Sequence, residues 1–121
     1  MPARVLIVDD HEGARNSVRD LLRHHSIPVC GEVENGIQAI EKVKALHPDV
    51  VLLDVNMPVM NGFEAAYEIR RIAPATKIVF FTIHGDPEYK AAAKLFGIDE
   101  FIDKATAGSH LVPALKRLTS G

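Results

Sequence analysis

The sequence has 121 residues, with 16 acidic and 14 basic side chains and a formal net charge of −2 when the histidines are neutral. A single domain of this length, residues 1–121, buries roughly two thirds of the surface that its unfolded chain exposes, so it needs no cross-links to fold. Acids and bases are mixed along the chain, and no apolar stretch approaches the about 20 residues of a bilayer span, which excludes a membrane segment and argues against direct nucleic-acid binding.

The single cysteine, Cys30, lies in an apolar segment and has no partner for an internal disulfide. Such an unpaired thiol is more often a packed, reduced side chain than a nucleophile. The residues after Met1 show no signal-peptide pattern, and together these features indicate a cytoplasmic protein.

The first half of the chain predicts three strands separated by two helices. Strands are indicated by short runs of β-branched residues and Leu, and helices by apolar residues that recur every three or four positions. Asn35 is a candidate helix cap, although Asn35-Gly36 is also a hairpin-turn dipeptide. In chain order these elements are a strand at 4–8, a helix at 12–23, a strand at 28–34, a helix from 36 that ends before Pro48, and a strand at 50–53.

The second half continues the alternation of helices and strands. Asp86 followed by Pro87 is typical of a helix start, and Gly97 of a helix end. The last helix is expected from about Gly108, with Ser109 as a candidate cap. In chain order the elements are a helix at 63–72 after a turn at 57–62, a strand at 77–82, a helix at 89–96, a strand at 100–103 and the C-terminal helix.

Five strands that alternate with five helices predict an α/β fold with a parallel sheet in the order 2-1-3-4-5 and helices on both faces. Ligands of such sheets bind beyond the carboxyl ends of the strands, where the winding reverses between the first and third strands. Asp9, Asp10 and Asp54 follow those two strands, and Thr82 and Lys104 follow the fourth and fifth. The sequence therefore predicts one site at this edge.

The residue types at this edge indicate phosphoryl chemistry. A carboxylate beside a divalent cation can attack phosphorus, and Asp54 is the candidate nucleophile. Asp9 and Asp10 are candidate ligands for Mg²⁺, with Mn²⁺ as the alternative, because hard oxygen donors suit these ions. Lys104 offers a positive charge to a phosphoryl oxygen, and Thr82 a hydroxyl that can follow a new phosphoryl group. Movement of Thr82 would leave space for the Phe101 ring to turn inward.

As a set, these residues resemble the receiver domain of bacterial two-component response regulators over essentially the whole chain. The matching motifs are Asp9-Asp10 after VLIV, Asp54 within VVLLDVNMPVMNG, Thr82 at the end of IVFFT and Lys104 in GIDEFIDKA.

The resemblance implies a (βα)5 fold of the flavodoxin-like or CheY-like type. It implies that Asp54 takes a phosphoryl group from the phosphohistidine of a sensor histidine kinase or a phosphotransfer protein. It also implies Mg²⁺ held by Asp10, Asp54 and the main-chain carbonyl of Asn56. The expected protein is a signalling switch that catalyses its own phosphorylation and dephosphorylation, and not an enzyme with turnover.

Two positions depart from the commonest form of this family. Ile83 is bulky where a small residue is frequent, so small phosphodonors and solvent should reach Asp54 more slowly. Ala105 replaces a frequent proline, a variant that resembles the receivers of NarL-type and LuxR-type transcription regulators. On that resemblance we expect a DNA-binding output domain C-terminal to this chain, with a stand-alone receiver as the alternative. A phosphorylation-dependent homodimer through the later helices is a separate expectation.

Two other classes use related folds or chemistry. Phosphatases of the haloacid dehalogenase type also form an acyl phosphate, but their nucleophile follows the first strand in an Asp-x-Asp motif, whereas Asn56 stands in the corresponding place after Asp54. A flavodoxin-like carrier of flavin mononucleotide would need a phosphate-binding first loop, which Asp9, Asp10 and Glu12 oppose. His11 and His84 lie in loops of the predicted edge and are candidates to tune its charge.

Overall fold

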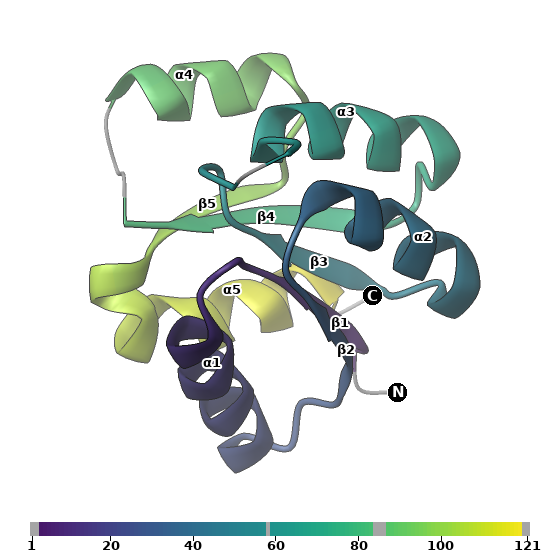
Figure 1. Ribbon diagram of the computed structural model, residues 1–121. Coiled ribbons are helices and arrows are strands. Elements are labelled where there is room, and N and C mark those ends of the chain that lie inside the picture. The colour runs from purple at the N-terminus through teal and green to yellow at the C-terminus, as the bar shows by residue number, and fades with distance from the viewer. Residues whose placement is uncertain (1–2, 58, 84–86, 120–121) are drawn as a thin grey trace.

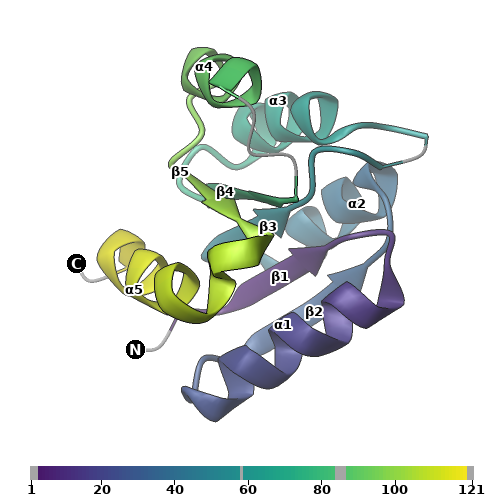
Figure 2. The same ribbon diagram turned by 90° about the vertical axis from the view of Figure 1, so that its left-hand side faces the viewer.

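The computed structural model describes residues 3–57, 59–83 and 87–119 as a central sheet with helices on both faces (Figure 1). In chain order the elements are β1 (Val5–Val8), α1 (Glu12–His24), β2 (Val29–Val33), α2 (Gly36–Leu46), β3 (Val50–Leu53), α3 (Gly62–Ile72), β4 (Lys77–Thr82), α4 (Pro87–Leu95), β5 (Glu100–Asp103), the 3-10 helix η1 (Lys104–Thr106) and α5 (Ala107–Thr119). Figure 2 shows α1 and α5 on one face of the sheet, and α2, α3 and α4 on the other. No described helix is both long and apolar enough to cross a membrane.

The five strands are parallel and ordered β2-β1-β3-β4-β5, which confirms the predicted fold and strand order. Every residue of β1 and β3 is buried, as expected for strands covered on both faces. Leu6 and Val8 pack towards α2, α3 and α4, whereas Val5 and Ile7 pack towards α1 and α5. Because both faces of these strands are apolar, polar side chains can only follow at their ends, where Asp9 and Asp54 lie.

Most predicted helix ends are confirmed by their hydrogen bonds. The side-chain oxygen of Asn35 accepts a bond from the amide of Gln38 at 2.9 Å, so Asn35-Gly36 begins a helix and not a hairpin. Asn61 forms a reciprocal capping box with Glu64 at the start of α3. Gly97, two residues after the end of α4, adopts a φ of 69°, which a glycine does without strain. The predicted cap Asp86 lies outside the described residues.

The predicted start of the last helix, at about Gly108, is confirmed to within one residue, but the predicted cap, Ser109, is wrong. The helix begins at Ala107, and Ser109 lies in its first turn, where its hydroxyl donates to the carbonyl of Thr106 at 3.3 Å. The preceding turn is capped instead by Asp103, whose carboxylate accepts a hydrogen bond from the amide of Ala105 at 2.9 Å. This cap lets η1 follow β5 directly and continue into α5, so the polypeptide needs no separate start at Ser109.

Cys30 lies in β2 and packs, partly buried, against the core under α2 and α3. Burial raises the pKa of its thiol above the ordinary value. A thiol with a raised pKa carries little thiolate at neutral pH, which agrees with the interpretation of Cys30 as a packed side chain.

Candidate functional site

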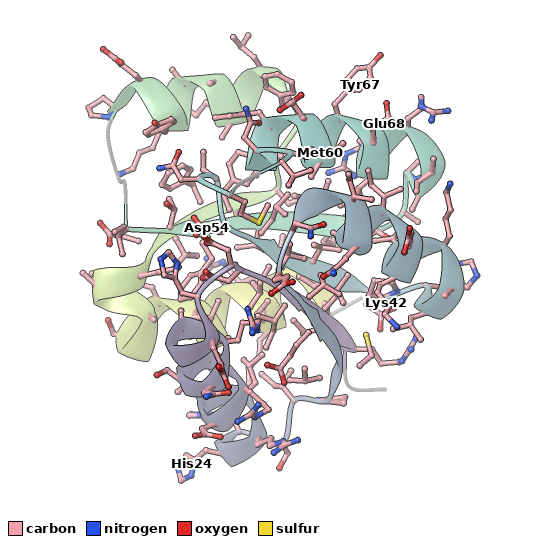
Figure 3. The ribbon with its side chains drawn as sticks, viewed as in Figure 1. His24, Lys42, Asp54, Met60, Tyr67 and Glu68 are labelled. Carbon is pink, nitrogen blue, oxygen red and sulfur yellow. The ribbon has the colours of Figure 1, made fainter. Side chains whose placement is uncertain are left out.

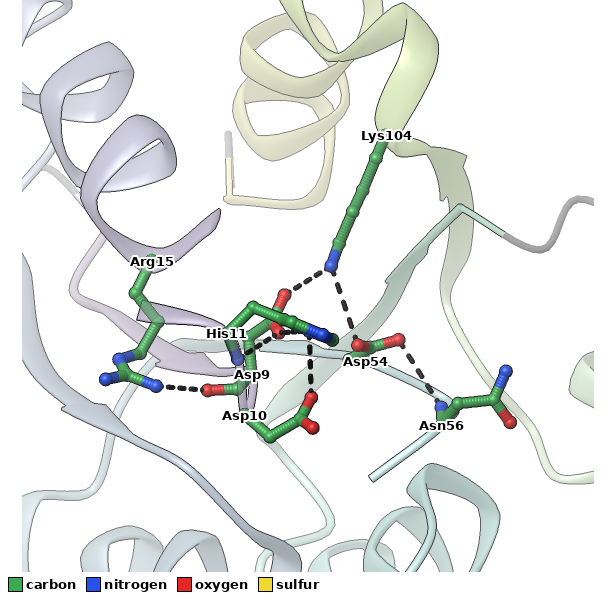
Figure 4. Close-up of polar contacts among 7 residues, drawn as sticks. All are labelled: Asp9, Asp10, His11, Arg15, Asp54, Asn56 and Lys104. Atoms are coloured by element: carbon green, nitrogen blue, oxygen red, sulfur yellow. Dashed lines mark hydrogen bonds and ion pairs between the residues drawn. The ribbon is translucent and has the colours of Figure 1, made fainter. Parts of the chain in front are cut away.

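Asp9, Asp54 and Lys104 meet at the carboxyl edge of the sheet, although Lys104 is 95 residues from Asp9 in the sequence (Figure 4). The Lys104 ammonium contacts Asp9 Oδ2 and lies 3.5 Å from Asp54 Oδ2. Val8 of β1 pairs with Leu53 of β3, so Asp9 and Asp54 follow the two neighbouring strands at the same level of the sheet. Both are buried, and Figure 3 shows Asp54 between the two helical layers. Lys104 therefore offsets the repulsion between two carboxylates that are nearly removed from water.

Asp10 and His11 extend this group on the side away from Lys104. The His11 amide donates to Asp9 Oδ1 at 2.9 Å, which fixes the loop between β1 and α1. Nδ1 of the His11 ring lies 3.3 Å from Asp9 Oδ1 and 3.1 Å from Asp10 Oδ1. The ring thus faces both carboxylates, as Figure 4 shows.

Arg15 is a site residue that the sequence reasoning missed. Its guanidinium donates to the main-chain carbonyl of Asp9 at 2.6 Å from the first turn of α1. Arg15 holds the backbone of the loop and leaves the Asp9 carboxylate free for Lys104 and His11. No sequence pattern marked it, because one arginine on an exposed helix start is ordinary.

The Asp54 carboxyl has a raised pKa, and the largest cause is its burial. The Lys104 ammonium lowers this pKa, the Asp9 carboxylate raises it, and hydrogen bonds from the Asn56 amide and the Thr82 side chain lower it. The Asn56 amide lies 3.4 Å from Asp54 Oδ1. Lys104, Asn56 and Thr82 therefore favour the charged form of Asp54, and burial, together with the Asp9 carboxylate, outweighs them.

The carboxylate cluster, which we define as Asp9, Asp10 and Asp54, fits a divalent cation. One oxygen from each of its members and one ring nitrogen of His11 lie within 4.8 Å of one another. Asp10 Oδ1 is buried and has no hydrogen-bond partner among the described residues, since the nearby His11 nitrogen lacks the alignment of a hydrogen bond. A buried carboxylate oxygen without a donor is costly, and a cation bound there would satisfy it. Asn56, two residues after Asp54, lies in the adjoining loop and is exposed.

Thr82 and Phe101 lie where the sequence placed them, on the two strands at the far side of Asp54. Thr82 ends β4, is fully buried and pairs with Asp103 of β5. Phe101 of β5 is partly buried, and its ring meets that of Phe80 edge to face at a centroid distance of 6.2 Å. Phe101 is thus already packed against the core below the site.

A crevice of about 230 Å³ opens beside Asp54. Its lining residues are His11, Ala14, Asp54, Asn56, Ile83 and Lys104. Ile83 stands at this opening with 68% of its surface exposed, which agrees with a side chain that restricts entry. His84, the other histidine predicted at this edge, lies outside the described residues.

The sequence is similar to one family of known proteins. Residues 5–116 match the family described as the response regulator receiver domain. The chain is 39% identical over 119 residues to the chemotaxis protein CheY of Thermotoga maritima. The alignment covers 98% of this chain and 99% of that protein. It is 36% identical over 121 residues to the nitrate/nitrite response regulator protein NarL of Escherichia coli K12. This alignment covers 99% of this chain but only 56% of NarL.

A solved structure supports the same relation. The signal receiver domain of the putative response regulator NarL from Mycobacterium tuberculosis superimposes with a TM-score of 0.91 at 32% sequence identity, with 99% of this chain and 98% of that chain covered.

Proposed function

The chain belongs to the response regulator receiver domain family, and from that premise we propose that Asp54 is its phosphoacceptor and Mg²⁺ its cofactor. Receiver domains accept a phosphoryl group in two-component signalling. The observation that carries the assignment to Asp54 is the convergence of a buried carboxylate, a second carboxylate and the Lys104 ammonium at the mouth of a crevice.

The proposed reaction is a phosphoryl transfer from the phosphohistidine of a sensor histidine kinase or a phosphotransfer protein. One Oδ atom of Asp54 forms a bond to phosphorus as the phosphorus–nitrogen bond of the donor breaks. Burial holds Asp54 away from bulk water, and Lys104 lies close enough to follow the new negative charge. Asp9, Asp10, Asp54 and the main-chain carbonyl of Asn56 would hold Mg²⁺, which when bound supplies positive charge beside the phosphoryl oxygens.

We further propose that Thr82 and Phe101 convert this chemistry into a change of shape. The Thr82 side chain already bonds to Asp54, so a phosphoryl group there would offer it new acceptor oxygens. A shift of Thr82 at the end of β4 would change the space beside β5, where the Phe101 ring could turn further inward. In this scheme the chain acts as a switch, and the uptake and loss of the phosphoryl group are its only catalysis.

The chain spans nearly all of the Thermotoga maritima CheY and about half of Escherichia coli NarL, so its wider setting is itself a proposal. We propose that residues 1–121 form one receiver domain. The resemblance to NarL-type and LuxR-type regulators favours a DNA-binding output domain as the element that it controls. We propose a phosphorylation-dependent homodimer as a separate feature of that control.

The acceptor is tested by incubating the protein with Mg²⁺ and acetyl phosphate and measuring its intact mass. The wild type should gain one phosphoryl group, and Asp54→Asn should gain none. Asp20→Asn is the matched control, because Asp20 is an exposed carboxylate on α1, and it should be labelled as the wild type is. Labelling of Asp54→Asn at the wild-type level would refute Asp54 as the acceptor.

The switch is tested with beryllium fluoride, which mimics the phosphoryl group on an aspartate. Amide resonances around Thr82 and Phe101 should shift in the wild type. Unchanged spectra at both residues, together with normal labelling of Asp54, would reject the switch and leave the acceptor intact.

A further inference from the structure

His11 occupies the N-cap position of α1 but does not cap it. Its side chain makes no hydrogen bond to the first turn of the helix. An N-cap side chain usually accepts a bond from the amides two or three residues later. Here the ring turns the other way, towards Asp9 and Asp10, although 71% of the side chain remains exposed. The capping role therefore does not explain how His11 is placed.

The position of Nδ1 is that of a fourth donor to the carboxylate cluster. One oxygen of each carboxylate and one ring nitrogen of His11 lie within 4.8 Å of one another, and Nδ1 is the nitrogen that contacts Asp9 and Asp10. Two ligands on one ion at a bond length of about 2.1 Å can be at most about 4.2 Å apart, so no pair of donors must close by more than about 0.6 Å. Lys104 occupies the opposite side of Asp9 and Asp54, so it leaves the side of Asp10 and His11 open to an ion.

A nitrogen donor changes which ions such a site prefers. Carboxylate oxygens and water suit Mg²⁺, which gives up its water reluctantly and gains little from an imidazole. Imidazole suits the borderline transition-metal ions, and Ni²⁺ binds mixed nitrogen and oxygen ligands more tightly than Mn²⁺ does. The same site can therefore hold Mg²⁺ through oxygens alone and Ni²⁺ through oxygens and His11.

We infer that Nδ1 of His11 is an additional ligand for transition-metal ions at the carboxylate cluster, so that this site binds Ni²⁺ with a contribution that Mg²⁺ does not receive. The inference rests on the proposed function, because it assigns His11 to the same cation site. It makes His11 a residue that sets metal selectivity, and it gives the protein a route by which a competing metal can occupy the site.

The test is calorimetric titration of the full chain with Ni²⁺ and, separately, with Mg²⁺. His11→Gln should weaken Ni²⁺ binding at least about tenfold, since changes even to residues behind the ligands cost that much. Its Mg²⁺ affinity should stay within about twofold of the wild type, because Mg²⁺ is held by oxygens. His24→Gln is the matched control, because His24 is an exposed histidine at the other end of α1, and it should leave both affinities unchanged.

A spectroscopic measurement reports the bond itself. In the Co²⁺-loaded wild type, ring protons of one histidine should show paramagnetic shifts that disappear in His11→Gln and persist in His24→Gln. Equal losses of Ni²⁺ and Mg²⁺ affinity in His11→Gln, or ring shifts that survive the substitution, would overturn the inference. Asp10→Asn tests the proposed magnesium site independently of His11. If it leaves Mg²⁺ binding unchanged, the proposed magnesium site fails, whatever the result for His11.

Discussion

Gly62 allows α3 to begin directly against the backbone of the proposed acceptor, and its replacement by alanine should disturb both. The amide of Gly62 donates to the Val55 carbonyl at 2.7 Å. A Cβ atom at this position would lie 2.4 Å from the Asp54 carbonyl oxygen and 2.7 Å from Val55 Cα. Both neighbours are main-chain atoms, so no side-chain rotation relieves the overlap. Ordinary contact begins at 3.4 Å, and the helix must therefore move away by about 1.0 Å (3.4 − 2.4).

These overlaps should lower the free energy of unfolding. Overpacking of this kind costs about 1–3 kcal/mol, and we take the upper end because two backbone contacts are violated. Weakening the bond from Gly62 to Val55 adds about 1 kcal/mol, whereas replacing a helical glycine by alanine returns about 0.5–1 kcal/mol. Gly62→Ala should therefore lower the free energy of unfolding by about 3 kcal/mol, measured by urea denaturation.

The matched control is Gly108→Ala, because Gly108 is also near the start of a helix and a Cβ atom there meets nothing within 4 Å. This variant should be as stable as the wild type or gain up to about 1 kcal/mol. A displacement of about 1 Å at a reacting group can also cost about 100-fold in rate, so Gly62→Ala should take up phosphoryl groups from acetyl phosphate far more slowly than Gly108→Ala. Equal stability of the two variants would refute the backbone-contact argument.

Three further predictions concern charge, access and packing. Asp54→Asn should raise the free energy of unfolding at neutral pH by about 0.5–2 kcal/mol. Because the folded-state pKa of Asp54 is raised, the stability that this carboxyl contributes is present below its unfolded pKa and is lost as pH rises through its folded pKa. The asparagine variant does not ionise and so avoids this loss at neutral pH. The gain should therefore vanish in urea titrations below about pH 3.8, the ordinary value, and a gain of the same size at both pH values would contradict the reasoning. Ile83→Ala should speed labelling by acetyl phosphate several-fold and change stability by less than about 0.5 kcal/mol, and slower labelling would exclude a restricting role. Arg70→Gln should lower the free energy of unfolding by about 1–3 kcal/mol, measured by urea denaturation. The Arg70 guanidinium joins α3 to the Gly97 carbonyl and, at 2.8 Å, to the Asp99 carboxylate. An unchanged midpoint would show that these bonds do not stabilise the fold.

The ends of β1 and β3 could be read from the sequence because each of these two strands is a short apolar run with a polar residue directly after it. The runs that end at Val8 and Leu53 gave both the strand positions and the placement of Asp9 and Asp54. The parallel topology then predicts that Asp9 and Asp54 lie close together, because the carboxyl ends of parallel strands share one edge of the sheet.

Other features depend on contacts that sequence patterns do not encode. The hydrogen bond from Arg15 to the Asp9 carbonyl is made by a flexible side chain, and no periodic sequence pattern predicts such a contact. Ser109 has the residue type of a good cap, but the turn that leads into α5 is capped by Asp103, whose carboxylate accepts a hydrogen bond from the Ala105 amide. The orientation of the His11 ring likewise follows from the two carboxylates that it faces.

Family membership decides among the three classes that the sequence left open. The match over residues 5–116 favours a receiver domain over a haloacid dehalogenase phosphatase or a flavin carrier. The position of Asp54 after β3, and not after β1, agrees with that outcome.

The contact between Lys104 and Asp9 also has a consequence for the order in which the protein matures. These residues are 95 positions apart, so their contact closes a loop that includes most of the chain. Contacts of such separation form late, after the local helices and the neighbouring strand pairs. During synthesis Asp9 and Asp54 leave the ribosome long before Lys104, so a partly made chain carries the acids without their counter-charge. The ability to accept a phosphoryl group should therefore appear only when β5 has joined the sheet, which makes labelling of this site a measure of complete folding.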